Sequence, residues 1–231
     1  MRAAFFDVDG TIVKSNIVMP YVHIRRSELS SIGNLFWTPF FLLKALTYII
    51  VDKIDRATFN RMFYRNYRGR LVEDKEKMAK LCFEAYIRPN IHDQAKERIR
   101  QLKEEGYLIV LVTGSLDFLI QPLAAQLEID HMIAARLEEK DGRFTGKLDG
   151  NPVSDKEKAT RIRAYAEANK INLPESQAYG DSMADLPMLV DMYMDGRLKL
   201  DELISRTMPL EDINTAFDLL QKGEVARSVI V

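Results

Sequence analysis

The stretch that decides the fold is Phe5-Phe6-Asp7-Val8-Asp9-Gly10-Thr11-Ile12-Val13. It continues an apolar run from Ala3 that is too short for a helix and is typical of a buried strand. Residues i and i+2 of a strand share one face, so Asp7 and Asp9 point into one pocket if the backbone stays extended. One carboxylate can then act as a nucleophile while the other moves a proton, and both can help to hold a hard cation. The alternative is an ordinary turn rich in Asp and Gly.

A helix and a second strand follow later in the chain. Apolar residues recur at helical spacing over residues 93–105, and Gly106 supplies the end of that helix. Residues 107–112 are a continuous apolar run, as in strands buried on both faces. The order strand, helix, strand predicts a βαβ unit of a parallel sheet.

Thr113-Gly114-Ser115 closes this second strand. A hydroxyl group followed by free backbone N–H groups at a strand-to-helix turn suits a phosphate oxygen. The alternative is that Thr113 or Ser115 caps the next helix. The sequence then predicts a helix over 117–127, strands over 132–137 and 143–148 joined by a hairpin turn at Asp141-Gly142, and a helix over 155–169.

Lys156 and Lys158 open the last of these helices. Most helical lysines are solvated, but a lysine in the first turn beside a phosphate pocket can offset anionic charge. A second acidic pair, Asp181 and Asp185, follows a short strand that begins at Gln177. Four residues of spacing place both carboxylates on one face of a first helical turn, where they repel unless a cation lies near them. The alternative is one helix cap and one solvated side chain.

The segment between these motifs, from Lys14 to about Arg88, has a helical pattern. Within it, residues 32–51 carry only one charge, Lys44, and basic residues flank the stretch. We expect two helices that split near Pro39 and pack as the core of a small helical domain. The alternatives are contact with a membrane surface and a true membrane span.

Composition excludes several classes of protein. The chain has 231 residues and is 47% hydrophobic, which supports a substantial buried core rather than disorder. The net charge of -1 gives no indication of a nucleic-acid partner. A single cysteine, Cys82, excludes an intramolecular disulfide framework and a cysteine-based structural zinc site. No basic-then-apolar leader is apparent, so we expect a cytoplasmic location, with peripheral membrane contact as the alternative.

Taken together, the motifs resemble the haloacid dehalogenase superfamily of phosphohydrolases, in the branch (subfamily IB) that includes phosphoserine phosphatase. The resemblance covers roughly residues 1–190 and rests on four motifs in the right order. These are Asp7-Val-Asp9-Gly-Thr11, Val112-Thr113-Gly114-Ser115, the helix-borne Lys158, and Gly180-Asp181-Ser-Met-Ala-Asp185-Leu-Pro. The resemblance implies an α/β fold, a HAD-like (Rossmannoid) parallel sheet flanked by helices with an inserted helical cap. Its domains would be a core at 1–14 and 88–190 and a cap at 15–87.

The resemblance also implies a mechanism and a cofactor. Asp7 would attack phosphorus and form an aspartyl-phosphate, and Asp9 would serve as acid and then as base. Mg²⁺ would be held by Asp7, the backbone carbonyl of Asp9, and Asp181, with Asp185 in support. The groups expected to hold the phosphoryl oxygens are Thr113, the Gly114 N–H and Lys158, with Lys156 as the rival of Lys158.

The last 40 residues depart from this family, which would normally continue with another strand and a proline-containing loop. Residues 191–231 instead resemble the C-terminus of zinc-dependent medium-chain alcohol dehydrogenases, notably Pro209 to Phe217 and Gly223 to Val231. They predict a helix from Pro209 that ends at Gly223 and a strand over Arg227–Val231. Nothing implies dehydrogenase activity, because the chain has no GxGxxG motif after a strand. Docking on the sheet edge and a poorly matched fusion remain the two alternatives.

The sequence therefore predicts a Mg²⁺-dependent phosphomonoester hydrolase that acts on a small or amphiphilic phosphorylated metabolite. The alternative is a catalytically impaired, phosphate-binding or membrane-associated scaffold with a fused C-terminus. The sequence sets no oligomeric state.

Overall fold

The centre of the protein is a parallel four-stranded sheet. The structure is a computed structural model that describes residues 1–182, 185, 187–189, 206–208 and 228–230. The sheet has the order β3-β2-β1-β6, with every neighbouring pair parallel. Its strands are β1 (Ala3–Phe6), β2 (Leu108–Leu116), β3 (His131–Ala135) and β6 (Gln177–Tyr179). The expected α/β fold with a parallel sheet is confirmed, and the fully buried β1 lies in its interior.

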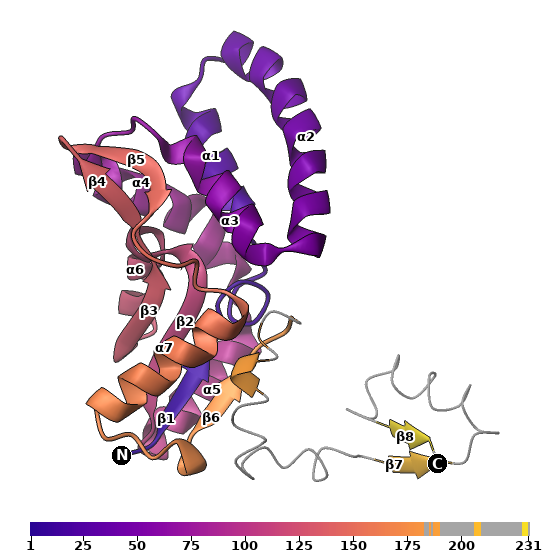
Figure 1. Cartoon of the computed structure of the whole chain (residues 1–231), viewed down its shortest axis with the longest axis vertical. Helices are drawn as coiled ribbons and strands as arrows, with labels where there is room; N and C mark the ends of the chain where they lie inside the picture. Colours follow the sequence, from indigo (N-terminus) through magenta and orange to yellow (C-terminus); the bar gives the residue numbers. More distant parts are fainter. Residues whose placement is uncertain (183–184, 186, 190–205, 209–227, 231) are drawn as a thin grey trace.

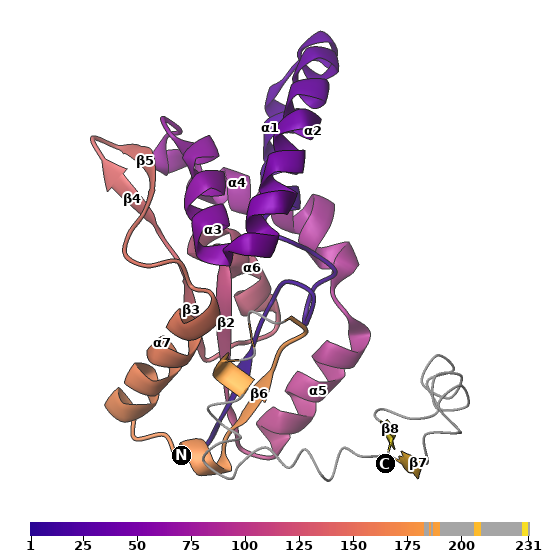
Figure 2. The ribbon, with the colours of Figure 1, turned by 45° about the vertical axis from the view of Figure 1, so that its right-hand side comes forward.

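Three helices cover the two faces of this sheet. They are α5 (Asp93–Glu104), α6 (Asp117–Gln126) and α7 (Asp155–Ala168). In Figure 2, α5 and α7 lie on opposite sides of the strands. The apolar face of α5 buries Ile99 and Leu102, which is the periodicity that the sequence predicted. The βαβ prediction is confirmed, because α5 joins the parallel neighbours β1 and β2.

Two strand boundaries differ from the prediction. β2 does not end at Val112 but continues through Thr113-Gly114-Ser115 to Leu116, with a shift of register against β3 at this point. The strand expected over 132–137 is broken at the exposed Arg136, where the chain leaves the parallel sheet. Its second part, β4 (Leu137–Lys140), pairs antiparallel with β5 (Arg143–Leu148). The predicted hairpin turn at Asp141-Gly142 is confirmed, with both residues at positive φ (51° and 69°).

A helical region stands on top of the sheet in Figure 1. It contains α1 (Val18–Glu28), α2 (Ser31–Ile54), α3 (Arg56–Tyr64) and α4 (Lys75–Cys82), with short helical turns before and after α4. Backbone hydrogen bonds join it to the β4–β5 hairpin, from Gly69 N to Phe144 O (2.8 Å) and from Val72 N to Gly142 O (2.9 Å). The hairpin therefore lies against the side of the helical region (Figure 1).

The prediction for residues 32–51 was wrong on two counts. α2 is one continuous helix, with Pro39 inside it. Proline removes one backbone hydrogen bond, which is tolerated here because the fourth residue before it, Leu35, lies on an exposed face where water can serve its carbonyl group. In addition, only 11% of the most apolar 18-residue window of α2 is buried.

The two faces of α2 have different surroundings. One face packs on the helical region through Trp37, Phe41 and Tyr48. The opposite side is exposed to between 55% and 80%, and we call it the outer face of α2. The outer face consists of Ile32, Leu35, Phe36, Phe40, Leu42, Leu43, Leu46, Ile49, Ile50 and Ile54. α2 is therefore not the buried core helix that the sequence predicted.

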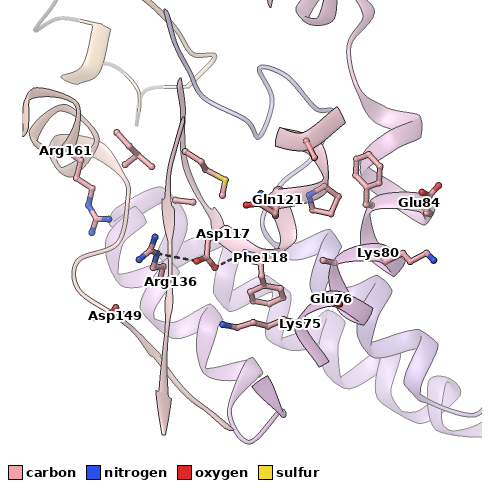
Figure 3. Close-up of a pocket in the computed structure, with 17 residues that line it drawn as sticks. Lys75, Glu76, Lys80, Glu84, Asp117, Phe118, Gln121, Arg136, Asp149 and Arg161 are labelled. Atoms are coloured by element: carbon pink, nitrogen blue, oxygen red, sulfur yellow. Dashed lines mark hydrogen bonds and ion pairs between the residues drawn. The ribbon is translucent and has the colours of Figure 1, made fainter. Parts of the chain in front are cut away.

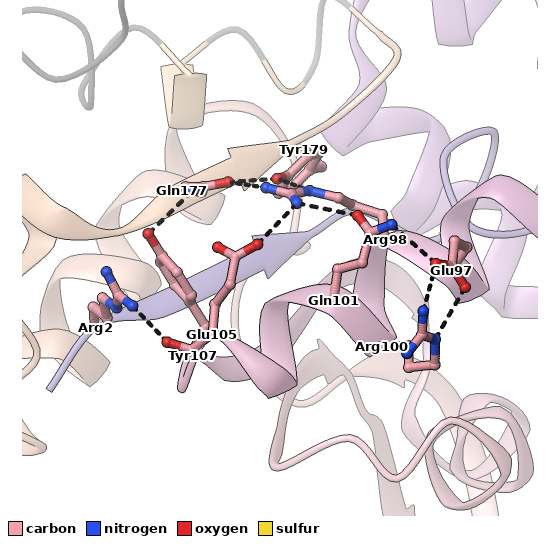
Figure 4. Close-up of polar contacts among 9 residues, drawn as sticks. All are labelled: Arg2, Glu97, Arg98, Arg100, Gln101, Glu105, Tyr107, Gln177 and Tyr179. Atoms are coloured by element: carbon pink, nitrogen blue, oxygen red, sulfur yellow. Dashed lines mark hydrogen bonds and ion pairs between the residues drawn. The ribbon is translucent and has the colours of Figure 1, made fainter.

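A polar network holds the edge strand β6 against α5 (Figure 4). Arg98 donates hydrogen bonds to the Tyr179 hydroxyl (2.9 Å) and to Gln177 Oε1 (3.1 Å). The Tyr179 ring also stacks on Phe6 of β1, with 4.3 Å between ring centroids. These contacts fix the strand that leads into Asp181.

Most of the C-terminal segment lies outside the described residues, including the predicted helix from Pro209 and its docking on the sheet edge. The described parts are β7 (Arg206–Met208) and β8 (Ser228–Ile230), which form a parallel pair. β8 falls within the strand predicted over Arg227–Val231.

Candidate active site

The four sequence motifs meet at the carboxyl ends of the parallel strands. Asp7 follows the last residue of β1 directly, and its backbone N–H bonds to Tyr179 O of β6 (2.9 Å). The Thr113-Gly114-Ser115 segment lies at the end of β2, and Asp181 comes two residues after β6. Lys158 is on the first turn of α7. The carboxyl edge of a parallel sheet is the usual place for a ligand in this class of fold.

Lys158 makes the central ion pairs of the site. Its ammonium group donates to Asp7 Oδ1 at 2.6 Å and also pairs with Asp185 Oδ1. All three side chains are buried, with 4%, 5% and 0% of Lys158, Asp7 and Asp185 exposed. Lys156 is exposed, so of the two rival lysines it is Lys158 that the fold brings to the nucleophile candidate.

Three carboxylates gather around one point. Asp7, Asp181 and Asp185 each offer an oxygen atom, and these atoms lie within 4.8 Å of one another. Two glycines make room for them, because a Cβ atom on Gly10 would lie 2.1 Å from Asp181 and one on Gly180 would lie 2.6 Å from Asp185. A set of oxygen ligands with this charge fits a hard cation such as Mg²⁺.

Asp9 has a separate environment from this group of carboxylates. Its Oδ2 accepts a hydrogen bond from the Ser115 hydroxyl at 2.6 Å. The Ser115 N–H in turn donates to Thr113 Oγ1 at 3.0 Å. Neither hydroxyl caps α6, whose N-cap is Leu116, so that alternative for the tripeptide is wrong. The contact between Ser115 and Asp9 was not predicted from the sequence, although the place of Ser115 in the second motif indicated that it lies near the site.

Burial changes the proton affinities of these groups. Burial raises the pKa of Asp7 to about 7, against the opposing effect of the Lys158 ammonium. Burial also raises the pKa of Asp9, and the Ser115 hydrogen bond only partly offsets this. For Lys158, burial alone would lower the pKa, but the carboxylates of Asp7 and Asp185 raise it overall. Lys158 therefore stays charged, and Asp9 is suited to carry a proton.

The helical region also contributes to the site. Arg56 and Asn60, one turn apart on α3, line the same small cavity as Asp7, Asp9 and Lys158. One turn further along α3, the Tyr64 hydroxyl donates to Gly114 O of the second motif. Arg56 also pairs with Asp52 at 3.0 Å. Arg56 and Asn60 could not be assigned to the site from the sequence, because only tertiary packing shows which face of α3 meets the strands.

Residues 4–190 match the haloacid dehalogenase-like hydrolase family. The chain belongs to this family. Membership in this hydrolase family agrees with the four motifs and supports the predicted phosphatase class.

Three known proteins illustrate the relationship. Phosphoserine phosphatase of Lactococcus lactis is 37% identical over 143 residues, which cover 60% of this chain and 66% of that enzyme. Protein CicA of Caulobacter vibrioides is 31% identical over 186 residues, which cover 80% of each chain. A substrate-bound phosphoserine phosphatase structure has a TM-score of 0.60 at 24% identity and covers 81% of this chain and 80% of its own. The structural likeness shows the fold alone.

The haloacid dehalogenase-like site brings together every residue that the sequence proposed for it. Asp7, Asp181, Asp185 and Lys158 lie in one cluster, and Asp9 is joined through Ser115 to Thr113. Gly114 lines the cavity beside them. Their catalytic, phosphate-binding and metal-binding roles stay predictions.

The cavity at these residues is small, and a larger one lies elsewhere among the described residues. The cavity lined by Asp7 and Lys158 has a volume of about 20 Å³. A second cavity, of about 960 Å³, lies beside α4, α6 and β3 and contains Phe118, Arg136 and Asp117 (Figure 3). It shares no lining residue with the first. We take the small cavity as the candidate site, because it holds the buried charges, and Arg56 and Asn60 of α3 line it.

Proposed function

We propose that the protein is a Mg²⁺-dependent phosphomonoester hydrolase that works through an aspartyl-phosphate on Asp7. The observation that carries the proposal is the position of Asp7, which is buried at the end of β1, paired with Lys158 at 2.6 Å and grouped with Asp181 and Asp185. A carboxylate held in this way is oriented and charge-balanced for attack on phosphorus. The substrate is a small or amphiphilic phosphorylated metabolite.

The first step transfers the phosphoryl group to the protein. A carboxylate oxygen of Asp7 attacks phosphorus, and the bond from phosphorus to the ester oxygen breaks. Asp9 gives its proton to the leaving oxygen, which departs as an alcohol. The raised pKa of Asp9 favours the protonated form that this step requires.

The second step releases phosphate. Asp9, now a carboxylate, takes a proton from water while the water oxygen attacks phosphorus of the aspartyl-phosphate. The bond from phosphorus to Asp7 breaks and the Asp7 carboxylate is restored. The water attacks from the position that the alcohol has left, opposite the Asp7 oxygen, so Asp9 acts on the same face of the site in both steps.

Lys158, Thr113 and the Gly114 N–H hold the phosphoryl oxygens. Lysine has three N–H donors, so Lys158 can contact a phosphoryl oxygen in addition to its two carboxylates. Mg²⁺ would be held by Asp7, the Asp9 carbonyl, Asp181 and Asp185, and when bound it neutralises charge on the phosphoryl group. Fixed positive charge at this point stabilises the transition state.

Arg56 and Asn60 are proposed to contact the rest of the substrate. They approach the phosphoryl site from the cap and offer a cation and an amide to polar groups beyond the phosphate. The small cavity volume implies that α3 moves away from the strands to admit substrate. The cytoplasmic location stays a prediction, compatible with the resemblance to phosphoserine phosphatases.

The test is Mg²⁺-dependent release of phosphate from p-nitrophenyl phosphate. We expect Asp7→Asn to lower kcat by at least about a thousandfold, because the variant has no nucleophile while its volume is nearly unchanged. The matched control is Asp117→Asn, which makes the same chemical change on α6 outside the small cavity and should stay within about threefold of the parent.

Two results would contradict the proposal. Activity of Asp7→Asn near that of the parent would exclude the mechanism. Phosphate binding by the parent without any turnover, for several phosphomonoesters, would instead favour the impaired scaffold.

A further inference from the structure

The outer face of α2 is an apolar surface without a partner among the described residues. All ten of its side chains are large and apolar, and none of them carries a charge. A helix that is apolar on all sides is normally buried in protein or in lipid. Contiguous apolar surface of this kind marks a site of interaction. The question is what covers it.

The charge around α2 favours an anionic surface. The segment from residue 15 to residue 72 contains nine Lys or Arg residues and three Asp or Glu residues, whereas the whole chain has a net charge of -1. Six of these basic residues are exposed, namely Arg26, Lys44, Lys53, Arg61, Arg65 and Arg68. An apolar helix face in a basic setting is the composition of segments that lie on anionic lipid. The same excess of positive charge opposes a second copy of this chain.

We propose that α2 lies in the plane of an anionic lipid membrane with its outer face in the interface. With 24 residues, α2 is about 36 Å long, which is long enough to cross a bilayer. Crossing would, however, separate Phe41 from Tyr21 of α1 (5.9 Å) and Tyr48 from Phe63 of α3 (5.6 Å), and it would carry Lys44 into the lipid. Lying flat keeps these inner contacts and covers the exposed side chains. The proposal does not depend on the phosphatase activity.

Flotation with vesicles tests the proposal on the full chain. We expect the protein to float with vesicles of phosphatidylcholine and phosphatidylglycerol, and to float less with phosphatidylcholine alone. The double variant Leu43→Glu/Leu46→Glu places two charges on the outer face and should lower partitioning by about tenfold or more. The matched control, Gln94→Glu/Ala164→Glu, adds the same charge at exposed positions of α5 and α7 and should float like the parent.

A second pair of measurements separates charge from apolar insertion. Arg26→Gln/Lys53→Gln should lower binding to the mixed vesicles by about fivefold or more. High salt should also lower the binding of the parent to these vesicles. The single tryptophan, Trp37, lies on the inner face of α2, so the variant Trp37→Phe/Phe40→Trp moves the fluorophore to the outer face, where vesicles that contain brominated lipid should quench it. The variant Asp7→Asn should float like the parent, which keeps this test distinct from that of the proposed function.

Several outcomes would overturn the proposal. These are the absence of flotation, equal flotation of the Leu43→Glu/Leu46→Glu variant and the parent, and unquenched fluorescence of the Trp37→Phe/Phe40→Trp variant. Concentration-dependent dimers without vesicles, abolished by Leu43→Glu/Leu46→Glu, would assign the outer face to a second copy of the chain. A cooperative thermal unfolding transition in each variant, like that of the parent, shows that the variant is folded and that its loss of binding has another cause.

Discussion

The site beside β1 and the outer face of α2 reverse the usual distribution of side chains in opposite ways. At the site, Asp7, Asp185 and Lys158 carry charge in places that are at most 5% exposed. On α2, ten large apolar side chains are more than half exposed. Buried charge and contiguous exposed apolar surface are both costly, and both are uncommon in a soluble domain.

The comparison separates two kinds of function. The buried charges have partners within the protein, since the single Lys158 ammonium pairs with both carboxylates and offsets part of their desolvation cost. The outer face of α2 has no such partner among the described residues and needs one from outside them. The buried charges therefore bear on the proposed reaction, and the outer face of α2 bears on the proposed place of that reaction at a membrane.

The largest stability effect is expected at Lys158. Lys158→Ala leaves Asp7 and Asp185 buried without their cation, so we expect a loss of about 3–5 kcal/mol in the free energy of unfolding near neutral pH. The control Lys156→Ala removes an exposed lysine two residues away and should change stability by less than about 0.5 kcal/mol. Chemical denaturation without Mg²⁺ measures the free energy of unfolding of both variants and of the parent. Equal stability of the two variants would show that the buried ion pairs do not form.

The two faces of α2 give a matched pair of substitutions. Phe41→Ala removes an inward ring 5.9 Å from Tyr21 and should destabilise the protein by about 3–4 kcal/mol. Leu43→Ala, at a residue that is 68% exposed, should cost less than about 0.5 kcal/mol in dilute solution without lipid. A large loss for Leu43→Ala would mean that the outer face is already covered in the free protein.

A pH-dependent effect is expected for Asp7 in the absence of Mg²⁺. Its pKa is raised from 3.8 to about 7, so the folded state keeps a proton that the unfolded chain releases between these values. Stability of the metal-free protein should therefore fall as pH rises from about 4 to 7. Asp7→Asn removes this penalty and should be more stable than the parent by about 2–3 kcal/mol at pH 8, with no such gain near pH 4.

Thermal unfolding with a chelator, across this pH range, checks the prediction. Adding Mg²⁺ should reverse the order at pH 8, because the cation binds the folded parent through the Asp7 carboxylate. A gain in stability for Asp7→Asn that does not vary with pH would show that burial has not shifted the proton affinity of Asp7.

The site could be predicted from the sequence because its residues are tied to strand ends. Asp7 follows an unmistakable buried strand, and the carboxyl ends of parallel strands share one edge of the sheet. Once the βαβ order was inferred, the meeting of Asp7, Thr113 and Asp181 followed from topology. Lys158 needed one further step, since only packing of α7 distinguishes it from Lys156.

The exposure of α2 could not be predicted, because an apolar pattern does not say which partner covers it. Residues 32–51 have the same composition whether protein or lipid surrounds them. Pro39 was expected to split the helix, yet its position near the exposed Leu35 made the lost hydrogen bond tolerable. Arg56 and Asn60 were missed for a related reason, since their role depends on which side of α3 faces the sheet.

The smallest expected effect concerns Arg98, which we expect to position the proposed metal ligand Asp181 from a distance. Arg98 holds Tyr179 and Gln177 of β6, and β6 leads directly to Asp181 (Figure 4). Arg98→Ala should lower stability by about 1 kcal/mol and weaken Mg²⁺ binding by about twofold to fivefold, because the edge strand is held less firmly. Arg100→Ala is the matched control, since Arg100 is exposed and pairs only with Glu97 and Glu104 of the same helix among the contacts described for it.

Mg²⁺ titrations of the melting temperature and of phosphatase activity distinguish positioning from a general loss of stability. If Arg98 positions Asp181, the Mg²⁺ concentration for half-maximal activity rises in Arg98→Ala, while kcat at saturating Mg²⁺ stays close to that of the parent. A structural role without effect on the site would lower the melting temperature alone. The same Mg²⁺ dependence in Arg98→Ala and Arg100→Ala would therefore place the control of Asp181 elsewhere, with Thr11, whose hydroxyl donates to Asp181 Oδ1 at 3.3 Å, as the next residue to substitute.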